Sequence, residues 1–237
     1  MVSLLSPRLT PPVAPVRERR PLTAQAGDAF PRIPVSGTNR IPMSDALHKS
    51  RTAQRAIRAQ GRAARRSLGD DERRFASRSI AEQVFAASWF RRARHIACYL
   101  STDDEVDTWP IFSRAWRMNK RIFAPVVDRN LNMRFVEVTA NTDLLRSRFG
   151  AYEPRDGFSV HPSKLDIVLA PLVAFDDRNN RVGMGGGCYD RTFAFLNHRQ
   201  CYFRPRLIGL AFACQQVEKI AANPWDIRLS GVLSERK

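Results

Sequence analysis

The chain has 237 residues, of which 43% are hydrophobic, and a formal net charge of +16 at pH 7. This size and composition fit one sizeable soluble α/β domain with an appendage, and no apolar run approaches the roughly 20 residues that a membrane-spanning helix needs. Arginine supplies 34 of the 39 basic residues. The charge therefore indicates a polyanionic partner, a phosphorylated small molecule at least as well as RNA, or simply a codon bias toward arginine.

The cysteines carry no sign of a metal site. Cys98, Cys188, Cys201 and Cys214 form no CxxC pair and have no histidine at a ligand spacing, so a zinc site or a disulfide framework is not expected. Thiols without such a pattern favour a reducing compartment, and we expect the protein in the cytoplasm.

Residues 1–42 hold eight of the fifteen prolines. Proline removes the backbone donors that helices and sheets require, so we expect a disordered leader. Its six arginines resemble an organelle transit peptide, but so many prolines would break the amphipathic helix of such a peptide. The alternative is that Met43 is the natural start. Residues 43–237 are expected to form the folded domain.

Two helices are predicted at the start of this domain. The Ala/Arg-rich stretch from Asp45 to about Ser67 has a strong helix composition despite Gly61, and it should form a basic helix. A second helix is predicted from Asp70, where acidic residues favour the positive helix end. Its apolar positions are expected near one buried face: Phe75, Ile80, Val84 and Phe85.

The next stretch alternates strands and helices. "HIACYL" (95–100) and "RIFAPVV" (121–127) are predicted strands, with a helix over "WPIFSRAWRMN" (109–119) between them. This order predicts a parallel βαβ unit. A further helix is expected over residues 141–150, followed by the loop 151–157.

The last strands are "LDIVLAPLVAF" (165–175) and "RLIGLAFA" (206–213), with a glycine loop and a helix between them. The predicted fold is a single three-layer α/β domain with a mixed, largely parallel sheet flanked by helices. In such sheets, ligands bind at the carboxyl ends of the strands. Three unusual segments are expected at these ends: "TDDEVDT" (102–108), "RVGMGGGCYDR" (181–191) and the tail from residue 223.

The glycine loop favours phosphate binding. Gly183, Gly185, Gly186 and Gly187 leave main-chain N–H groups open to a phosphate, and the following helix would add its positive end. The loop is neither a Walker loop, which needs GxxxxGK(S/T), nor a GxGxxG fingerprint. The alternative is a tight strand-to-helix turn that needs only positive φ angles.

Charged residues flank this loop. Arg181 precedes it, and Asp190 and Arg191 follow in the first turn of the predicted helix. A carboxylate beside a phosphate is repelled unless a divalent cation lies between them, and Mg²⁺ binds carboxylates together with phosphate oxygens. The pattern therefore indicates a site for a nucleotide with Mg²⁺.

At this point the sequence resembles a known family. "DIVLAPLVAFDDRNNRVGMGGGCYDRTF" is similar to the signature of the 5-formyltetrahydrofolate cyclo-ligases. "ACYLSTDDEVDT", "FGAYEPRDG" and "NPWDIRLSGVLSE" resemble further segments of that family in the right order, over about residues 50–235. The resemblance implies ATP-dependent cyclisation of 5-formyltetrahydrofolate, with or without a polyglutamate tail, to 5,10-methenyltetrahydrofolate, with release of ADP and phosphate.

The resemblance also implies roles for particular residues. Residues that would bind the ATP phosphates are Arg58, Arg181, Val182, Gly183, Met184, Gly185, Gly186, Gly187, Cys188 and Tyr189. Residues that would bind the folate are Leu100, Glu105, Phe149, Met184, Gly185, Gly186, Gly187 and Cys188. Asp190 and Asp226 would hold Mg²⁺, and Arg181 and Glu105 would be catalytic, although whether Glu105 acts as a base is left open.

Two positions depart from the family pattern. Gln54 replaces a lysine directed at phosphate, and Cys188 replaces the first tyrosine of the Tyr-Tyr-Asp motif. Both changes favour an alternative, a non-catalytic folate- or nucleotide-binding paralogue. A third hypothesis, an RNA-associated protein, has no RNP, KH or zinc pattern in its support. We expect a monomer without membrane or nucleic-acid partners.

Overall fold

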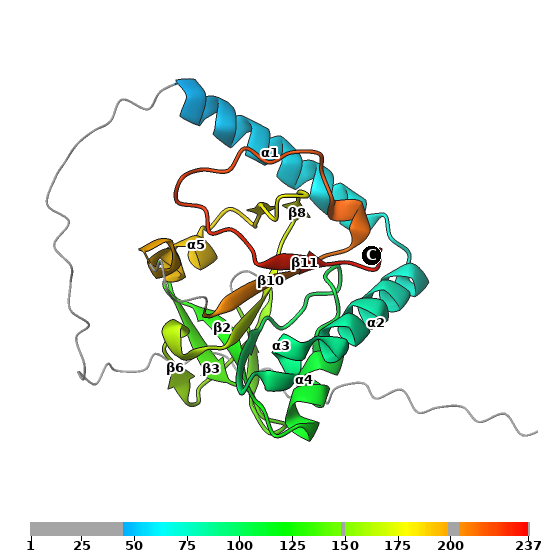
Figure 1. Ribbon diagram of the computed structural model, residues 1–237, viewed down its shortest axis with the longest axis vertical. Helices are drawn as coiled ribbons and strands as arrows, with labels where there is room; N and C mark the ends of the chain where they lie inside the picture. The colour runs from blue at the N-terminus through cyan, green and yellow to red at the C-terminus, as the bar shows by residue number, and fades with distance from the viewer. Residues whose placement is uncertain (1–44, 148–149, 199–203, 237) are drawn as a thin grey trace, which may run out of the picture. The chain divides into compact units, whose positions relative to one another are not determined.

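The structure is a computed structural model that describes residues 45–147, 150–198 and 204–236 (Figure 1). All of them belong to one compact unit, Pro42–Lys237. The leader predicted for residues 1–42 lies outside the described residues, as does Phe149.

A seven-stranded sheet runs through this unit in the order β11-β10-β7-β1-β2-β3-β6. Its strands are β1 (His95–Cys98), β2 (Arg121–Val127), β3 (Met133–Glu137), β6 (Ser159–Val160), β7 (Ile167–Pro171), β10 (Arg206–Leu210) and β11 (Gly231–Leu233). Neighbours from β11 to β2 are parallel, whereas β3 runs antiparallel to both β2 and β6. The predicted mixed, largely parallel sheet and the parallel unit over residues 95–127 are confirmed.

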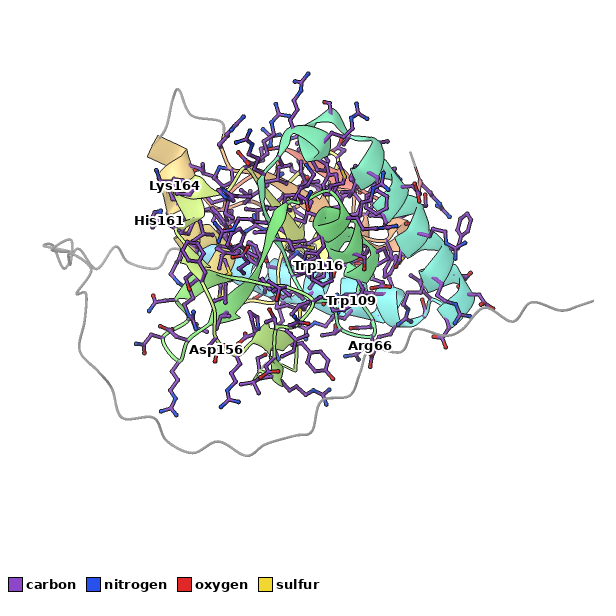
Figure 2. The ribbon with its side chains drawn as sticks, turned by 90° about the horizontal axis from the view of Figure 1, so that it is seen from below. Arg66, Trp109, Trp116, Asp156, His161 and Lys164 are labelled. Carbon is purple, nitrogen blue, oxygen red and sulfur yellow. The ribbon has the colours of Figure 1, made fainter. Side chains whose placement is uncertain are left out.

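Helices and irregular segments cover both faces of the sheet (Figure 1). On one face lie α2 (Asp70–Ala86), α3 (Ser88–Arg92) and α4 (Trp109–Arg117), where Trp109 and Trp116 pack edge to face (Figure 2). The other face is covered by α5 (Cys188–Thr192), the 3-10 helix η2 (Ala194–His198) and the segment before β11. The shorter 3-10 helices are η1 (Pro162–Lys164) and η3 (Ala213–Gln215).

Strand alternation divides the core between these two faces. In β1, Ile96 and Cys98 belong to the cluster under α2–α4, while Ala97 belongs to the cluster on the opposite face. Ile96 lies opposite Ile122 in β2 and Ile167 in β7. Each fully buried aliphatic side chain of this kind contributes about 1.5–3 kcal/mol. The apolar runs that predicted the strands therefore also hold the helical layer in place.

The prediction for Phe75 in α2 is wrong, because this side chain is 72% exposed. The buried positions of α2 are Ala76, Ser77, Ile80, Ala81 and Val84. A helix turns by about 100° per residue, which puts Phe75 roughly 140° from Ile80 and on the opposite side from the buried face. Phe85 is partly buried, as it lies at the edge of that face.

The helix predicted over residues 141–150 is also wrong. There β4 (Leu144–Arg146) pairs antiparallel with β5 (Tyr152–Pro154), which lies within the predicted loop. Gly150 adopts a positive φ of 82°, a conformation that favours a tight turn. Leu144 packs against the main core. The pairing between two short strands outweighs the local helix propensity.

The predicted strand 165–175 divides before the glycine loop. After β7, the short strand β8 (Ala174–Phe175) forms an antiparallel hairpin with β9 (Arg181–Val182). Its turn is closed by Asp176, whose carboxylate accepts hydrogen bonds from Arg178 N, Asn180 N and Ile220 N. Burial opposes ionisation, but hydrogen bonds from Asn180 and these amides hold the pKa of Asp176 below its ordinary value. The glycine loop is thus mounted on an ordered hairpin.

The predicted basic helix is confirmed as α1 (Asp45–Arg66). It packs against β8, β9 and η3, which follow the carboxyl ends of β7 and β10 (Figure 1). The closest approach is at Gly61, where a Cβ atom would lie 2.4 Å from the Val173 carbonyl oxygen. Only a residue without a side chain fits there, so the glycine inside this helix is a packing requirement.

We predict that Gly61→Ala destabilises the protein, although alanine is about 1 kcal/mol better than glycine within an exposed helix. The added methyl group would force α1 away from the Val173 backbone. Thermal unfolding should show a lower midpoint than in the wild type. Gly231→Ala is the control, because a Cβ atom there meets nothing within 4 Å. A higher midpoint for Gly61→Ala would contradict the close packing of α1.

Candidate active site

The glycine loop depends on two left-handed residues. Gly185 has φ 105° and Gly187 has φ 62°, both in the region that favours glycine. Gly187 is the N-cap of α5, and a Cβ atom on it would lie 3.0 Å from Arg191 Nη1. Arg191 in turn donates to the Gly186 carbonyl oxygen at 2.8 Å. The loop is therefore a fixed backbone turn that leaves main-chain groups accessible.

Arg58 reaches this loop from α1. Its Nε donates to the Gly183 carbonyl oxygen at 2.9 Å, and its Nη2 donates to Gln54 Oε1 at 3.2 Å. Burial and the charge of Arg62 lower the pKa of Arg58, while the Asp226 carboxylate acts in the opposite direction. The guanidinium is thus positioned beside the loop, with Asp226 within electrostatic reach.

Arg181 ties the loop to the closing segment of the chain. Its side chain is 5% exposed and forms an ion pair with Asp190 at 2.7 Å. It also donates to the Ile227 carbonyl oxygen, and Asp190 Oδ1 accepts from Ile227 N at 3.0 Å. These contacts bring Asp190 beside the chain segment that carries Asp226. Asp190 therefore has a structural role in addition to the predicted role as a Mg²⁺ ligand.

The two aspartates each retain one carboxylate oxygen for a ligand. Asp226 Oδ2 accepts from Asn223 N at 2.8 Å and from Asn223 Nδ2 at 3.1 Å. Asp190 Oδ2 and Asp226 Oδ1 accept no hydrogen bond from the described residues. Within these residues no three His, Cys, Asp or Glu side chains come together as a metal site. Two carboxylates fit Mg²⁺ that completes its coordination with phosphates and water.

Glu105 lies in a second part of the site, next to a buried arginine. Arg65 of α1 is 5% exposed, pairs with Asp104 at 2.9 Å and approaches Glu105 Oε1 at 3.5 Å. Glu105 Oε2 accepts from Thr102 N at 3.1 Å. Burial opposes the shift, but the charge of Arg65 and hydrogen bonds from Thr102 and Arg65 lower the pKa of Asp104. Arg65 thus orders the acidic turn that follows β1.

Tyr189 connects the two parts through the protein interior. Its ring stacks on Phe193, with ring centroids 6.2 Å apart, and Arg181 lies 5.9 Å above it. Its hydroxyl is buried and has no hydrogen-bond partner among the described residues. Burial raises the pKa of Tyr189, and the Cys98 and Glu105 groups act in the same direction, against Arg181. Glu105 and Tyr189 of α5 are therefore within electrostatic reach of each other.

The remaining predicted site residues are divided between surface and core. Met184 is 60% exposed at the loop tip, whereas Val182 and Leu100 are buried. Cys188 is partly buried and packs against the core cluster on the α5 side. Phe149 lies outside the described residues, so its predicted place at the folate is not observed.

A separate cavity of about 400 Å³ lies at the amino ends of β1 and β2. It is lined by Arg91, Arg92, Ala93, Arg94, His95, Met118, Asn119, Lys120 and Arg121. Lys120 there donates to the Arg91 and Ala93 carbonyl oxygens at the end of α3. Cations near helix carboxyl ends are stabilised by the helix dipole, which gives this cluster a structural explanation. The predicted residues gather at the other end of the strands.

Reasoning from sequence missed Arg65 and Asp176, which hold the two halves of the site in place. A signal for Arg65 was present, because it lies seven residues after Arg58, on the same face of the predicted basic helix. Asp176 also forms local hydrogen bonds with Arg178 N and Asn180 N, typical of a turn, but its contact with Ile220, 44 residues away, has no local signal.

Comparisons with known proteins agree with this architecture. The profile of the 5-formyltetrahydrofolate cyclo-ligase family matches residues 50–235. The chain is 34% identical to the 5-formyltetrahydrofolate cyclo-ligase of Escherichia coli over 73% of its own length and 95% of the relative. It is 35% identical to the enzyme of that name from Haemophilus influenzae over 75% of its length and 95% of the relative.

A solved structure shows the same fold. The NMR structure of Aquifex aeolicus 5,10-methenyltetrahydrofolate synthetase aligns with a TM-score of 0.66 at 27% identity. The alignment covers 78% of this chain and 90% of the Aquifex chain. Within the described residues, no helix has the length and apolar character needed to cross a membrane.

The fold and the matches together define an α/β enzyme of the ligase class. The chain belongs to the 5-formyltetrahydrofolate cyclo-ligase family, as the sequence resemblance predicted.

We predict that Asp190→Asn lowers the stability of the protein as well as its activity. The amide keeps a hydrogen bond but removes the charge opposite a buried guanidinium, and removing one partner of a buried pair can cost about 3–5 kcal/mol. Because the amide retains part of the contact, we expect a loss of about 1–3 kcal/mol in urea unfolding. Asp177→Asn at the exposed hairpin turn is the control. Unchanged stability of Asp190→Asn would show that the pair with Arg181 is dispensable.

Proposed function

We propose that this chain catalyses the ATP- and Mg²⁺-dependent cyclisation of 5-formyltetrahydrofolate to 5,10-methenyltetrahydrofolate, releasing ADP and phosphate. The observation that carries this proposal is the glycine loop with Arg58 on one side and the Arg181–Asp190 pair on the other. Membership of the cyclo-ligase family supports the choice of substrate.

In the proposed reaction, a lone pair of the formyl oxygen attacks the γ-phosphorus of ATP. The bond from that phosphorus to the β,γ-bridging oxygen breaks, and its electrons leave with ADP. N10 of the folate then attacks the formyl carbon and loses its proton. Phosphate departs with the former formyl oxygen and the electrons of the broken C–O bond. The protein mainly holds the reactants together and balances their charge.

The phosphate end of the site is proposed to lie at the glycine loop. Main-chain N–H groups and the start of α5 would face a bound phosphate, and Arg58 would add a positive charge from α1. Arg181 already donates to Asp190 and Ile227. We therefore propose that Arg181 acts by fixing Asp190 and by adding its charge to the site.

Mg²⁺ is proposed to bind at Asp190 and Asp226. Each aspartate has one oxygen held by the protein and one without a partner among the described residues. Bound there, Mg²⁺ would neutralise charge on the ATP phosphates. Asn223 and Ile227 keep the two carboxylates in place for this role.

The folate is proposed to bind between the acidic turn and the loop. Glu105, held by Thr102 and Arg65, offers a carboxylate to the N–H groups of the pteridine. Leu100 and the loop residues Met184 to Cys188 would line the same space, although Leu100 is buried before any ligand binds. A polyglutamate tail would be attracted by the net positive charge of the chain.

The setting of the enzyme is proposed from its thiols. Cys98 is buried and Cys214 is exposed, and neither forms a disulfide. These thiols are consistent with the reducing cytoplasm, where we propose that the enzyme works as a monomer.

We predict that purified protein forms the methenyl chromophore from 5-formyltetrahydrofolate, ATP and Mg²⁺. Arg58→Gln should raise KM for ATP by about 10- to 100-fold, because hydrogen bonds from a charged group contribute about 1.5–3 kcal/mol. Arg55→Gln, at an exposed position of the same helix, should behave like the wild type. Binding of both substrates without turnover would instead support the non-catalytic paralogue.

Glu105→Gln is predicted to separate the two substrates. The amide keeps the size of the side chain but loses the charge that the folate would contact, so KM for the folate should rise about 10- to 100-fold. The affinity for ATP, measured by calorimetry, should change little. Asp103→Asn is the control, since Asp103 is exposed in the same turn. An equal loss of ATP affinity would place Glu105 outside the folate site.

A further inference from the structure

Three arginines of α1 lie on the face that meets the site. Arg58, Arg62 and Arg65 follow one another at intervals of four and three residues. With 3.6 residues per turn, they fall within an arc of about 60° along the helix. Gly61, which touches the Val173 backbone, lies next to this row. The row therefore runs along the seam between α1 and the rest of the protein.

The two outer arginines are anchored at opposite parts of the site. Arg58 donates to Gly183 in the glycine loop, at the proposed phosphate end. Arg65 pairs with Asp104 and Glu105, at the proposed folate end. The helical rise of about 1.5 Å per residue places Arg62 about 6 Å from the first and about 4.5 Å from the second along the axis.

Arg62 itself has no such anchor. Its Nε is buried without a hydrogen-bond partner, and its guanidinium makes no ion pair with any residue that the structure describes. A buried polar group without a partner is rare in folded proteins. Because Arg62 lies between Arg58 at the glycine loop and Arg65 at the acidic turn, a ligand that spans these two parts of the site could supply the missing partner.

The positive charges around Arg62 also favour a negatively charged group nearby. Arg58 and Arg62 are close enough for the charge of Arg62 to lower the pKa of Arg58. The nearby carboxylates act on the outer arginines: Asp226 on Arg58, and Asp104 with Glu105 on Arg65. Two like charges held together without a counter-ion between them are stabilised by negative charge nearby, and most strongly by the charge that spreads over the phosphoryl oxygens during transfer.

We propose that Arg62 is a further catalytic residue that contacts the phosphoryl group during its transfer from ATP to the formyl oxygen. This inference rests on the proposed function. During the transfer, the phosphorus bonds to the formyl oxygen as its bond to the bridging oxygen of ADP breaks. Negative charge then spreads over the three other phosphoryl oxygens, and a planar guanidinium can donate two hydrogen bonds to them.

The test compares Arg62→Ala with the wild type in steady-state turnover. If the charge of Arg62 stabilises the transferring phosphoryl group, Arg62→Ala should lower kcat by about 10³- to 10⁵-fold, as for arginines with that role in other phosphoryl transfers. KM for ATP and for the folate should change less than about threefold, because such a contact is specific to the transition state. Guanidine hydrochloride at millimolar concentration should restore part of the activity of Arg62→Ala.

Matched controls separate a loss of catalysis from a loss of folding. Arg66→Ala, at the exposed position labelled in Figure 2, removes the same charge from the same helix and should keep wild-type kcat. Arg62→Lys should retain the fold, as judged by its thermal midpoint, with kcat at least about tenfold below wild type because lysine lacks the planar pair of donors.

Three results would overturn the inference. One is wild-type kcat in Arg62→Ala, and another is a loss confined to KM; both leave the proposed function standing. The third is a loss in Arg62→Ala that guanidine does not restore while Arg62→Lys is fully active, which would indicate a packing role. Absence of turnover in the wild type would instead refute the proposed function, and the role of Arg62 with it.

Discussion

The close contact between Gly61 and the Val173 carbonyl is the constraint on which the arrangement of the site depends. α1 does not belong to either helical layer of the sheet. It lies against β8, β9 and η3, beyond the carboxyl ends of the central strands. Only because the two backbones approach so closely can arginine side chains of this helix reach both the glycine loop and the turn after β1. A bulkier residue at position 61 would push α1 away from Val173, and Arg58, Arg62 and Arg65 would move with it.

Buried ion pairs give several site residues two roles. The side chains of Arg65 and Arg181 are each 5% exposed, and they pair with two carboxylates and one carboxylate respectively. Taking a guanidinium out of water is unfavourable unless a counter-charge and hydrogen bonds compensate. The acidic turn and α5 supply this compensation, so folding orders Glu105 and Asp190 before any substrate arrives. Substitutions at these residues will therefore mix effects on stability with effects on binding.

Much of the fold could be predicted from the sequence, because the central strands are short apolar runs that can be recognised without knowing their distant partners. The strands over β1, β2, β7 and β10 were predicted for this reason. The β4–β5 hairpin was missed because its stability comes from pairing and from Leu144 packing on the core, which local helix propensity does not reflect. Phe75 was misplaced through a wrong count of the helical turn.

The candidate site likewise combines features that local sequence reveals with features that depend on distant partners. The glycine loop was recognisable because positive φ angles and bare backbone require glycine itself. The roles of Asp190 and Arg65 depend on partners from other segments, Ile227 and the turn at Asp104, that no local spacing reveals. The family resemblance correctly predicted the family, while the substrate contacts of the individual residues remain predictions.

The two departures from the family pattern have different consequences in this structure. Gln54 is neutral, but its side-chain oxygen accepts from Arg58 and its amide donates to Ala221 at 3.4 Å. It therefore helps to hold an arginine that already contacts the loop. Cys188 packs against the same core cluster as Tyr189, so we expect the missing aromatic ring to alter first the packing beneath the loop. The phosphate end thus retains its charge, and any loss of affinity should fall on the folate.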